Sequence, residues 1–379
     1  MIPGETSTGS KRTEAMFGGP GGPARMVRAV GCRVWDDAGR EYLDTTMALG
    51  AVALGYAHPA VVAAVERAAR DGTVGPLPPT AEAELAERLL EWVPGAEAVR
   101  FLKTGAEAVA AAVRIARVVT GRERVVTCGY HGWLDWNQQD PGVPESVRRL
   151  CTRLPFGDVS AVEALESAAL LPAAIVVEPV IDRPPPVAWL AALRATASRT
   201  GAVLVFDEIK TGIRLGPGGA AARYGGEPDL VVLGKALGNG FPLAAVLGPE
   251  AIMQAATRTW ISSTLATEYV SLAAAGAVLD VCQREDVATT LARAGRRFQR
   301  GLEGIVTRHP DVAVAVRGIP EFCYLVFADE AVSSRVALEA VRRGLLFKRS
   351  AYNFVSLAHD REIIDDVLNR LENAVAAVE

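Results

Sequence analysis

The middle of the chain alternates short, uniformly apolar runs with longer segments whose apolar residues recur at helical spacing. Apolar runs without polar alternation are typical of parallel strands that are covered on both faces. The pattern predicts strands at 99–102, 124–127, 174–180, 202–206 and 230–233, and helices at 59–70, 81–92, 106–119, 160–170 and 189–200. We therefore expect residues 51–265 to form one large, doubly wound, mostly parallel α/β domain.

The two flanks of this domain have different patterns. Residues 1–50 begin rich in Gly, Ser, Thr and Pro and continue as two extended runs with turn residues, which predicts a hairpin. The C-terminal flank mixes helical periodicity (270–282, 286–304, 333–343 and 360–378) with extended segments (312–317 and 321–327). We expect residues 266–379 to form a smaller α+β domain, which residues 1–50 join.

The composition narrows the class of protein. The 379 residues are 50% hydrophobic and 22% charged, with a formal net charge of −4, which suits a large core and argues against disorder. This balance leaves no basic excess to neutralise phosphates, so we expect no nucleic-acid partner. A run of about 18 apolar residues is absent, so we expect no membrane-spanning helix.

The N-terminal residues, cysteines and histidines bear on location and metals. The opening MIPGETSTGSKR lacks the apolar core of a secretory signal. The five cysteines are odd in number and far apart, which fits neither a disulfide framework nor a zinc motif, and the four histidines lack ligand spacing. We therefore expect a cytoplasmic protein without a metal site.

Two polar residues follow predicted strands at the edge where parallel sheets bind ligands. Asp207 ends one strand, either as a carboxylate at the rim of a ligand site or as a helix cap. Lys235 follows another strand among glycines, where lost hydration favours the amine form that a Schiff-base nucleophile needs. The alternative for Lys235 is a side chain that extends to solvent from a loop.

A third candidate is the segment Lys-Thr-Gly-Ala-Glu-Ala at 103–108, which lies between a predicted strand and a helix. A glycine in the first turn of a helix exposes backbone N–H groups that suit a phosphate, although the segment is not a Walker A loop and a plain helix start would look the same. A phosphate site, a strand-end carboxylate and a desolvated lysine together match pyridoxal phosphate, which has a phosphate, a ring nitrogen that must stay protonated and an aldehyde.

Several segments carry a family resemblance that covers about residues 31 to 359. They are GCRVWDDAGREYLD, LGYAHP, AERLLEWVPGAEAVRFLKTGAEA, AVRIARVVTGR, GYHGW, VVEPV, VLVFDEIKTGIR and PDLVVLGKALGNGFPLAAVLG. On these motifs the chain resembles the class III pyridoxal-phosphate aminotransferases, in the branch that includes glutamate-1-semialdehyde aminomutase. The resemblance implies fold type I and an obligate homodimer with active sites at the subunit interface.

The same resemblance implies roles for individual residues. Lys235 resembles the Schiff-base lysine, and Asp207 resembles the partner of the pyridine nitrogen. The other implied cofactor contacts are Gly105 and Ala106 in the phosphate turn, Tyr130 stacked on the ring, Ile209 on the opposite ring face, Glu178 of the EPV motif, and Thr264 reaching the phosphate from the second subunit.

The chain also departs from the family pattern. Ala106 stands where Ser or Thr is common, residues 263–269 differ from the mutase GTLSGNP, and residues 133–144 lack the mutase Gly-Ser-Gly gating loop. A mutase needs such a gate to retain its intermediate, so these departures favour an ordinary aminotransferase. The motifs KTGAEA, GYHGWLDW and SST…E…SLAAA are more similar to relatives that act in amino-sugar or specialised-metabolite pathways. This inference is an analogy with proteins of the same fold.

The implied reaction is a ping-pong transfer of an amino group from a donor, for which L-glutamate is a candidate, to a carbonyl acceptor. Four further residues are candidates for substrate contacts: His131, Trp133, Lys348 and Arg349. For each there is a plain alternative, namely a structural histidine, a packing tryptophan and two exposed basic residues. An aminomutase and a non-catalytic, ligand-binding homologue stay open as alternative functions.

Overall fold

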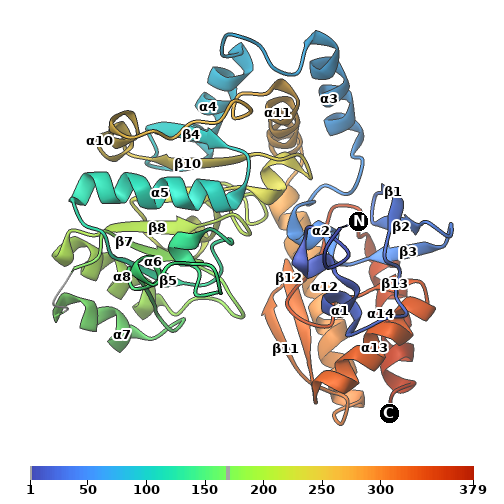
Figure 1. The fold of residues 1–379 in the computed structure, drawn as a ribbon. Helices are drawn as coiled ribbons and strands as arrows, with labels where there is room; N and C mark the ends of the chain where they lie inside the picture. The colour runs from blue at the N-terminus through green and yellow to red at the C-terminus, as the bar shows by residue number, and fades with distance from the viewer. Residues whose placement is uncertain (1, 168–170) are drawn as a thin grey trace. The chain divides into compact units, whose positions relative to one another are not determined.

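In the computed structural model, which describes residues 2–167 and 171–379, residues 60–284 form one compact unit around a seven-stranded sheet (Figure 1). The sheet has the order β4-β10-β9-β8-β7-β5-β6. Its strands are β4 (Ala98–Leu102), β5 (Val125–Cys128), β6 (Cys151–Arg153), β7 (Ala174–Val177), β8 (Val203–Asp207), β9 (Leu230–Leu233) and β10 (Ala244–Gly248). Only β10 runs against its two neighbours, so the sheet is mostly parallel as predicted.

Helices cover both faces of this sheet. The helices and helical turns of the unit are α3 (Pro59–Asp71), α4 (Thr80–Trp92), α5 (Gly105–Thr120), η2 (Asp135–Asn137), α6 (Glu145–Arg148), α7 (Val159–Glu163), η3 (Ala164–Ser167), α8 (Val187–Thr200), α9 (Gly219–Tyr224), η4 (Lys235–Gly238), α10 (Glu250–Met253), η5 (Gln254–Arg258) and α11 (Tyr269–Arg284). Alternate residues of β7 face opposite layers: Val176 belongs to the core that contains α5, and Ile175 belongs to the core that contains α8. Both faces are therefore buried, as uniformly apolar strands require.

The structure differs from the predicted elements at two strands and one helix of this unit, and it adds the short helices α6, α9 and α10, which were not predicted. Strands β6 and β10 were not predicted, because a three-residue strand and an alanine-containing run carry little strand signal. The predicted helix at 160–170 is instead the short α7, capped by Asp158, followed by the turn η3. The end of that predicted helix, Leu170, lies outside the described residues.

The second compact unit joins the residues up to Pro59 with Glu285–Glu379. Its strands form the sheets β1-β2-β3-β13 and β11-β12-β14, with bounds β1 (Met26–Val30), β2 (Arg33–Asp36), β3 (Glu41–Asp44), β11 (Ala313–Ile319), β12 (Phe322–Phe327), β13 (Leu345–Leu346) and β14 (Asn353–Phe354). Its helices are η1 (Gly9–Lys11), α1 (Thr13–Phe17), α2 (Met47–Gly50), α12 (Val287–Arg308), α13 (Glu330–Arg342) and α14 (Arg361–Ala376). The predicted N-terminal hairpin is present as β1 and β2, and β3 pairs with the C-terminal strand β13.

The boundaries of the compact units fall later in the chain than the predicted 50/51 and 265/266. Helix α11 belongs to the unit with the large sheet, because Arg88 of α4 donates to the carbonyl of Gly276 and pairs with Asp280, at 3.0 and 2.8 Å. The functional division into domains stays a prediction. Among the helices of the described ranges, none is both long and apolar enough to span a membrane.

Candidate active site

The strands of the large sheet end in register at one edge. Val177 of β7 lies opposite Cys128 of β5 and Phe206 of β8, and Asp207 lies opposite Val232 of β9. Strand β4 points the same way, because β10 is antiparallel to both β4 and β9. The segments that follow these strands therefore share one edge, and they contain most of the site residues that the sequence predicts.

Lys235 begins the turn η4, two positions after the end of β9. Its backbone is left-handed, with φ of +49°, which costs a non-glycine residue about 1–2 kcal/mol. Its half-buried side chain forms no ion pair or hydrogen bond within residues 2–167 and 171–379. Burial lowers the pKa of Lys235, and the neighbouring ammonium of Lys210 lowers it further. This environment favours the uncharged, nucleophilic amine.

Asp207 is buried at the end of β8 and forms a close pair with His131. Nδ1 of His131 donates to Oδ2 of Asp207 at 2.7 Å, and the N–H of Ile209 donates to Oδ1 at 3.2 Å. Nε2 of His131 is buried and has no hydrogen-bond partner within the described chain. The ring of His131 also stacks on Trp136, with 6.4 Å between centroids. Asp207 is therefore held by its neighbours as an oriented acceptor at this edge.

Glu178 follows β7 and forms a buried ion pair that the sequence did not reveal. Nζ of Lys210 lies 2.7 Å from Oε2 of Glu178, and the N–H of Tyr130 donates to Oε1 at 2.8 Å. Burial alone would raise the pKa of Glu178, but the charge and hydrogen bond of Lys210, the N–H of Tyr130 and the nearby His131 together outweigh this effect and the pKa is lowered. Lys210 was missed although a lysine inside the strand-end run Phe-Asp-Glu-Ile-Lys-Thr-Gly was a visible signal.

Helix α5 begins at the predicted phosphate turn. Thr104 caps the helix through a reciprocal capping box with Glu107. Because Gly105 and Ala106 lie in the first turn, their N–H groups have no acceptors inside the helix. A Cβ on Gly105 would lie 2.5 Å from Cδ1 of Ile209. The N-terminal end of α5 is therefore packed directly against Ile209, two positions after Asp207.

Three of the predicted contacts are exposed in the chain. The side chains of Tyr130 and Trp133 are 69% and 73% exposed, and Thr264 is also exposed. Exposure of two large aromatic rings next to the buried His131–Asp207 pair suits a surface that binds a ligand or another chain. The residues Tyr130, His131 and Gly132 form one turn, and a Cβ on Gly132 would lie 2.4 Å from Cβ of Ala106.

Lys348 and Arg349 belong to the other compact unit and have partners there. Nζ of Lys348 donates to Oγ of Ser350 at 3.0 Å and to the carbonyl of Ala351, and its side chain is buried. Arg349 pairs with Glu330 at 3.3 Å. Neither residue is the exposed cation that the plain alternative described, and their role in binding substrate stays a prediction.

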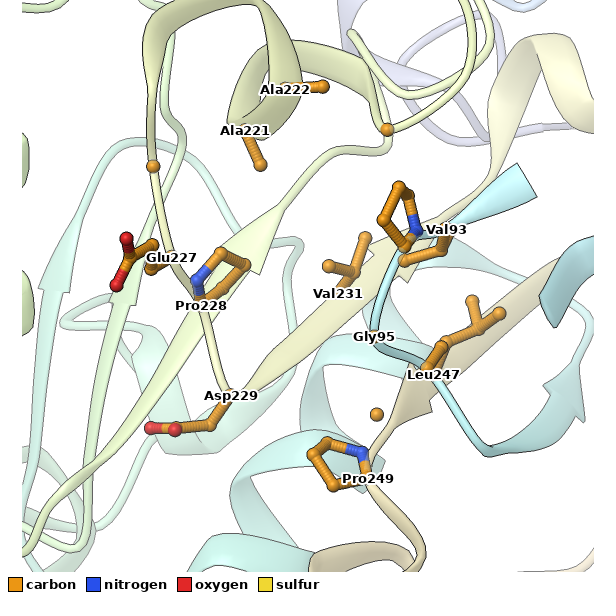
Figure 2. A pocket seen from close by; sticks show the side chains of 15 residues that line it. Val93, Gly95, Ala221, Ala222, Glu227, Pro228, Asp229, Val231, Leu247 and Pro249 are labelled. Atoms are coloured by element: carbon orange, nitrogen blue, oxygen red, sulfur yellow. The ribbon is translucent and has the colours of Figure 1, made fainter. Parts of the chain in front are cut away.

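A separate hollow of about 290 Å³ lies at the opposite edge of the sheet (Figure 2). Pro228 and Asp229, which precede β9, line it together with Leu247 and Pro249 at the end of β10. Lys235 lies beyond the other end of β9. This hollow is therefore distinct from the edge that carries the lysine and the carboxylates.

Comparison with known proteins agrees with this geometry. The family model described as "Aminotransferase class-III" matches residues 20–137 and 157–375, and the chain belongs to this family. The chain is 36% identical over 361 residues to a 2'-deamino-2'-hydroxyneamine transaminase from Streptomyces kanamyceticus, covering 93% of this chain and 91% of that protein. It is 32% identical over 394 residues to a glutamate-1-semialdehyde 2,1-aminomutase from Aquifex aeolicus, covering 94% and 92%.

The fold of the chain matches a solved structure that contains the cofactor. The structure of the FumI protein of Sphingopyxis sp. MTA144, in its PLP internal aldimine form, superposes with a TM-score of 0.94 at 26% identity and covers 100% of this chain and 94% of that one. The protein is thus a fold type I enzyme of the class III aminotransferases, and its cofactor is pyridoxal phosphate. It acts on small molecules by pyridoxal-phosphate-dependent transamination.

Proposed function

We propose that Lys235 is the residue that binds the cofactor's aldehyde covalently and that Asp207 accepts from the protonated ring nitrogen. The observation that carries this assignment is the pairing pattern. Asp207 is paired with His131 and Glu178 with Lys210, while Lys235 forms no ion pair within the described residues. A partly desolvated ammonium without an ion-pair partner is disfavoured, and burial lowers the pKa of Lys235 and so favours its free amine. A nucleophilic amine beside an oriented carboxylate suits pyridoxal phosphate.

The remaining cofactor contacts follow from the same edge of the sheet. The first-turn N–H groups at Gly105 and Ala106 would hold the phosphate, because a helix N-terminus favours an anion. The exposed ring of Tyr130 would cover one face of the pyridine, and Ile209 would pack on the other. Thr264 of a second subunit would reach the phosphate and replace the hydroxyl that Ala106 lacks.

In the reaction, the cofactor supplies an electron sink for the carbanion that forms when the substrate loses a proton. Lys235 would move that proton as a general base and acid, for which its lowered pKa suits it. His131 keeps the carboxylate of Asp207 in one orientation. Glu178 holds the backbone of Tyr130, and so fixes the turn that carries the stacking ring.

The substrate that we propose is a carbonyl acceptor of the amino-sugar or specialised-metabolite class, with an amino acid such as L-glutamate as donor. The 36% identity to a transaminase named for a neamine derivative supports this class. The identity to aminomutases is only slightly lower, which keeps the mutase as the competing function. The segment 133–144 lacks the Gly-Ser-Gly gate of the mutases, and this difference favours the transaminase.

We also propose a homodimer in the cytoplasm. Trp260 is 82% exposed and Leu265 is 53% exposed, on either side of the residue that would reach the partner's phosphate, Thr264. Large exposed apolar side chains of this kind often mark an interface. Cys32, Cys128, Cys151 and Cys323 are free thiols, which suits a reducing compartment.

The test of the assignment is the visible absorption that appears when the purified protein is reconstituted with pyridoxal phosphate. We expect Lys235→Ala to lose this band and Lys11→Ala, which removes an exposed lysine of the other unit, to keep it. A band that survives in Lys235→Ala would remove that residue from its proposed role.

Half-reactions then separate the candidate functions. Amino sugars or L-glutamate should convert the wild-type cofactor to the pyridoxamine form in a transaminase. Conversion of glutamate 1-semialdehyde without any added amino acceptor would establish the mutase instead. A cofactor that no amine converts would favour the non-catalytic homologue.

A further inference from the structure

A second lysine lies close to Lys235, and none of the functions above uses it. Lys210 is only 6% exposed and lies three positions beyond Asp207, in the turn that follows β8. Its ammonium is 2.7 Å from Oε2 of Glu178, whose side chain is 13% exposed. An ion pair so deeply buried gains little stability over an apolar pair, so its presence at this edge calls for a local role.

The contacts of Glu178 show what this pair holds in place. Its two oxygens bind Lys210 on one side and the N–H of Tyr130 on the other. The next residue is His131, whose ring pairs with Asp207. A Cβ on Gly129 would lie 2.8 Å from Cγ of Glu178, so the side chain fits closely beneath the turn at 129–132. Lys210 thus fixes the carboxylate on which this turn rests.

The charges that surround Lys235 give Lys210 a second effect. Those charges are the cations Lys210 and Arg214 and the carboxylates of Glu178 and Asp207. Each carboxylate already has a closer partner, Lys210 for Glu178 and His131 for Asp207. After burial, Lys210 is the largest contribution that lowers the pKa of Lys235.

We propose that Lys210 is a positioning residue, which holds Glu178 against the 129–132 turn and whose charge disfavours a second ammonium at Lys235. This inference rests on the proposed function, because it concerns the availability of the amine that would bind the cofactor. Like-charge proximity is a known way to activate a lysine nucleophile. A purely structural ion pair would hold the turn but leave the protonation of Lys235 unchanged.

The experiment is competitive labelling of the apoenzyme with trace acetic anhydride at a series of pH values from about 6 to 11. This range is roughly the one within which a lysine with a perturbed pKa titrates. Mass spectrometry of the peptide that contains Lys235 gives the pH midpoint of its amine without any catalytic assay. The variants are Lys210→Met, Lys210→Arg and Glu178→Gln. The matched control is Arg194→Met, which breaks the ion pair to Asp229 near the start of β9, at the other edge of the sheet.

We expect opposite shifts from the two partners of the pair. Lys210→Met should raise the midpoint of Lys235 by about one pH unit, which is about tenfold less free amine at a given pH below the midpoint. Glu178→Gln should lower the midpoint, because it removes a carboxylate that stabilises the ammonium. Lys210→Arg should stay near the wild type, and Arg194→Met should not move it.

An unchanged or lowered midpoint of Lys235 in Lys210→Met would overturn the proposal. Equal shifts in Lys210→Met and Lys210→Arg would also overturn it, because they would show that the size of the side chain and not its charge matters. If Lys210→Met does not fold, the direction of the shift in Glu178→Gln decides: an unchanged or raised midpoint refutes the electrostatic effect. Failure of the proposed function is distinguishable, because it would appear as a visible band that survives in Lys235→Ala, whatever the labelling shows.

Discussion

Gly132 offers a direct test of how tightly the turn at 129–132 is packed on the first turn of α5. Its φ is +95°, and a Cβ there would lie 2.4 Å from Cβ and 2.9 Å from Cα of Ala106. Neither atom is at the end of a flexible side chain, so the backbone of the turn or of the helix must move. Gly132→Ala should therefore separate His131 from Asp207 as well as strain the chain.

The magnitude follows from a comparison with Gly142. That residue has φ of +96°, but nothing lies within 4 Å of a Cβ placed on it. Both alanine variants incur the backbone cost of about 1–2 kcal/mol. Gly132→Ala also incurs the overpacking cost of about 1–3 kcal/mol, for a total of about 2–5 kcal/mol. Adding Ala106→Gly should recover part of the difference, because it removes the nearer of the two clashing atoms.

The assays are chemical denaturation and the dissociation constant of pyridoxal phosphate. We expect Gly132→Ala to unfold at lower denaturant than Gly142→Ala and to bind the cofactor at least tenfold more weakly, which corresponds to about 1.4 kcal/mol. Equal stability and equal cofactor affinity in the two variants would refute the reasoning, since the close packing against Ala106 would then have no energetic consequence.

Three further changes test other parts of the site. Thr104→Ala should cost about 1 kcal/mol of stability by removing the cap of α5, and Thr104→Ser should restore it in denaturation curves. His131→Phe leaves the buried carboxylate of Asp207 with one fewer donor, and should cost about 1.5–3 kcal/mol together with weaker cofactor binding, measured by equilibrium dialysis. Burial raises the pKa of Glu208 to about 6, above its ordinary 4.5. Because the folded state then holds the proton more tightly, the unfolding free energy should fall by about 2 kcal/mol in all as pH rises from well below 4.5 to well above 6, with about 1.3 kcal/mol of that fall between 4.5 and 6. Glu208→Gln should lack this component of the fall in denaturation curves across the whole range.

The sequence predicted most of the large sheet because its parallel strands are short, apolar and regularly separated by helices. It did not predict β10, whose alanines and flanking glycine and proline resemble a loop as much as a strand. What makes this segment a strand is its position between β4 and β9, where it pairs with both. The pairing with β4 joins residues more than a hundred positions apart, such as Ala244 and Leu102, and no local pattern contains such a contact.

The candidate site was predictable residue by residue but not pair by pair. Lys235 and Asp207 were recognisable because each follows an apolar run, and the family resemblance added Glu178 and Tyr130. The partners His131 and Lys210 were not assigned to those carboxylates, because each ion pair joins segments 76 or 32 residues apart (207 − 131 and 210 − 178). Local spacing indicates which side chains end a strand, whereas the order of the strands decides which of them meet.

Ile209 packs against both segments that flank the site and explains why glycine stands at position 105. A Cβ on Gly105 would lie 2.5 Å from Cδ1 of Ile209, and one on Gly234 would lie 3.4 Å from its Cγ2. Ile209 therefore lies beneath both the start of α5 and the turn that leads to Lys235, and forms an apolar floor between them. A floor of this kind, with anion-binding N–H groups on one side and an amine on the other, suits a flat ring with a phosphate arm better than a free anion. The two carboxylates next to the floor are already paired, whereas the amine of Lys235 forms no ion pair or hydrogen bond within the described residues.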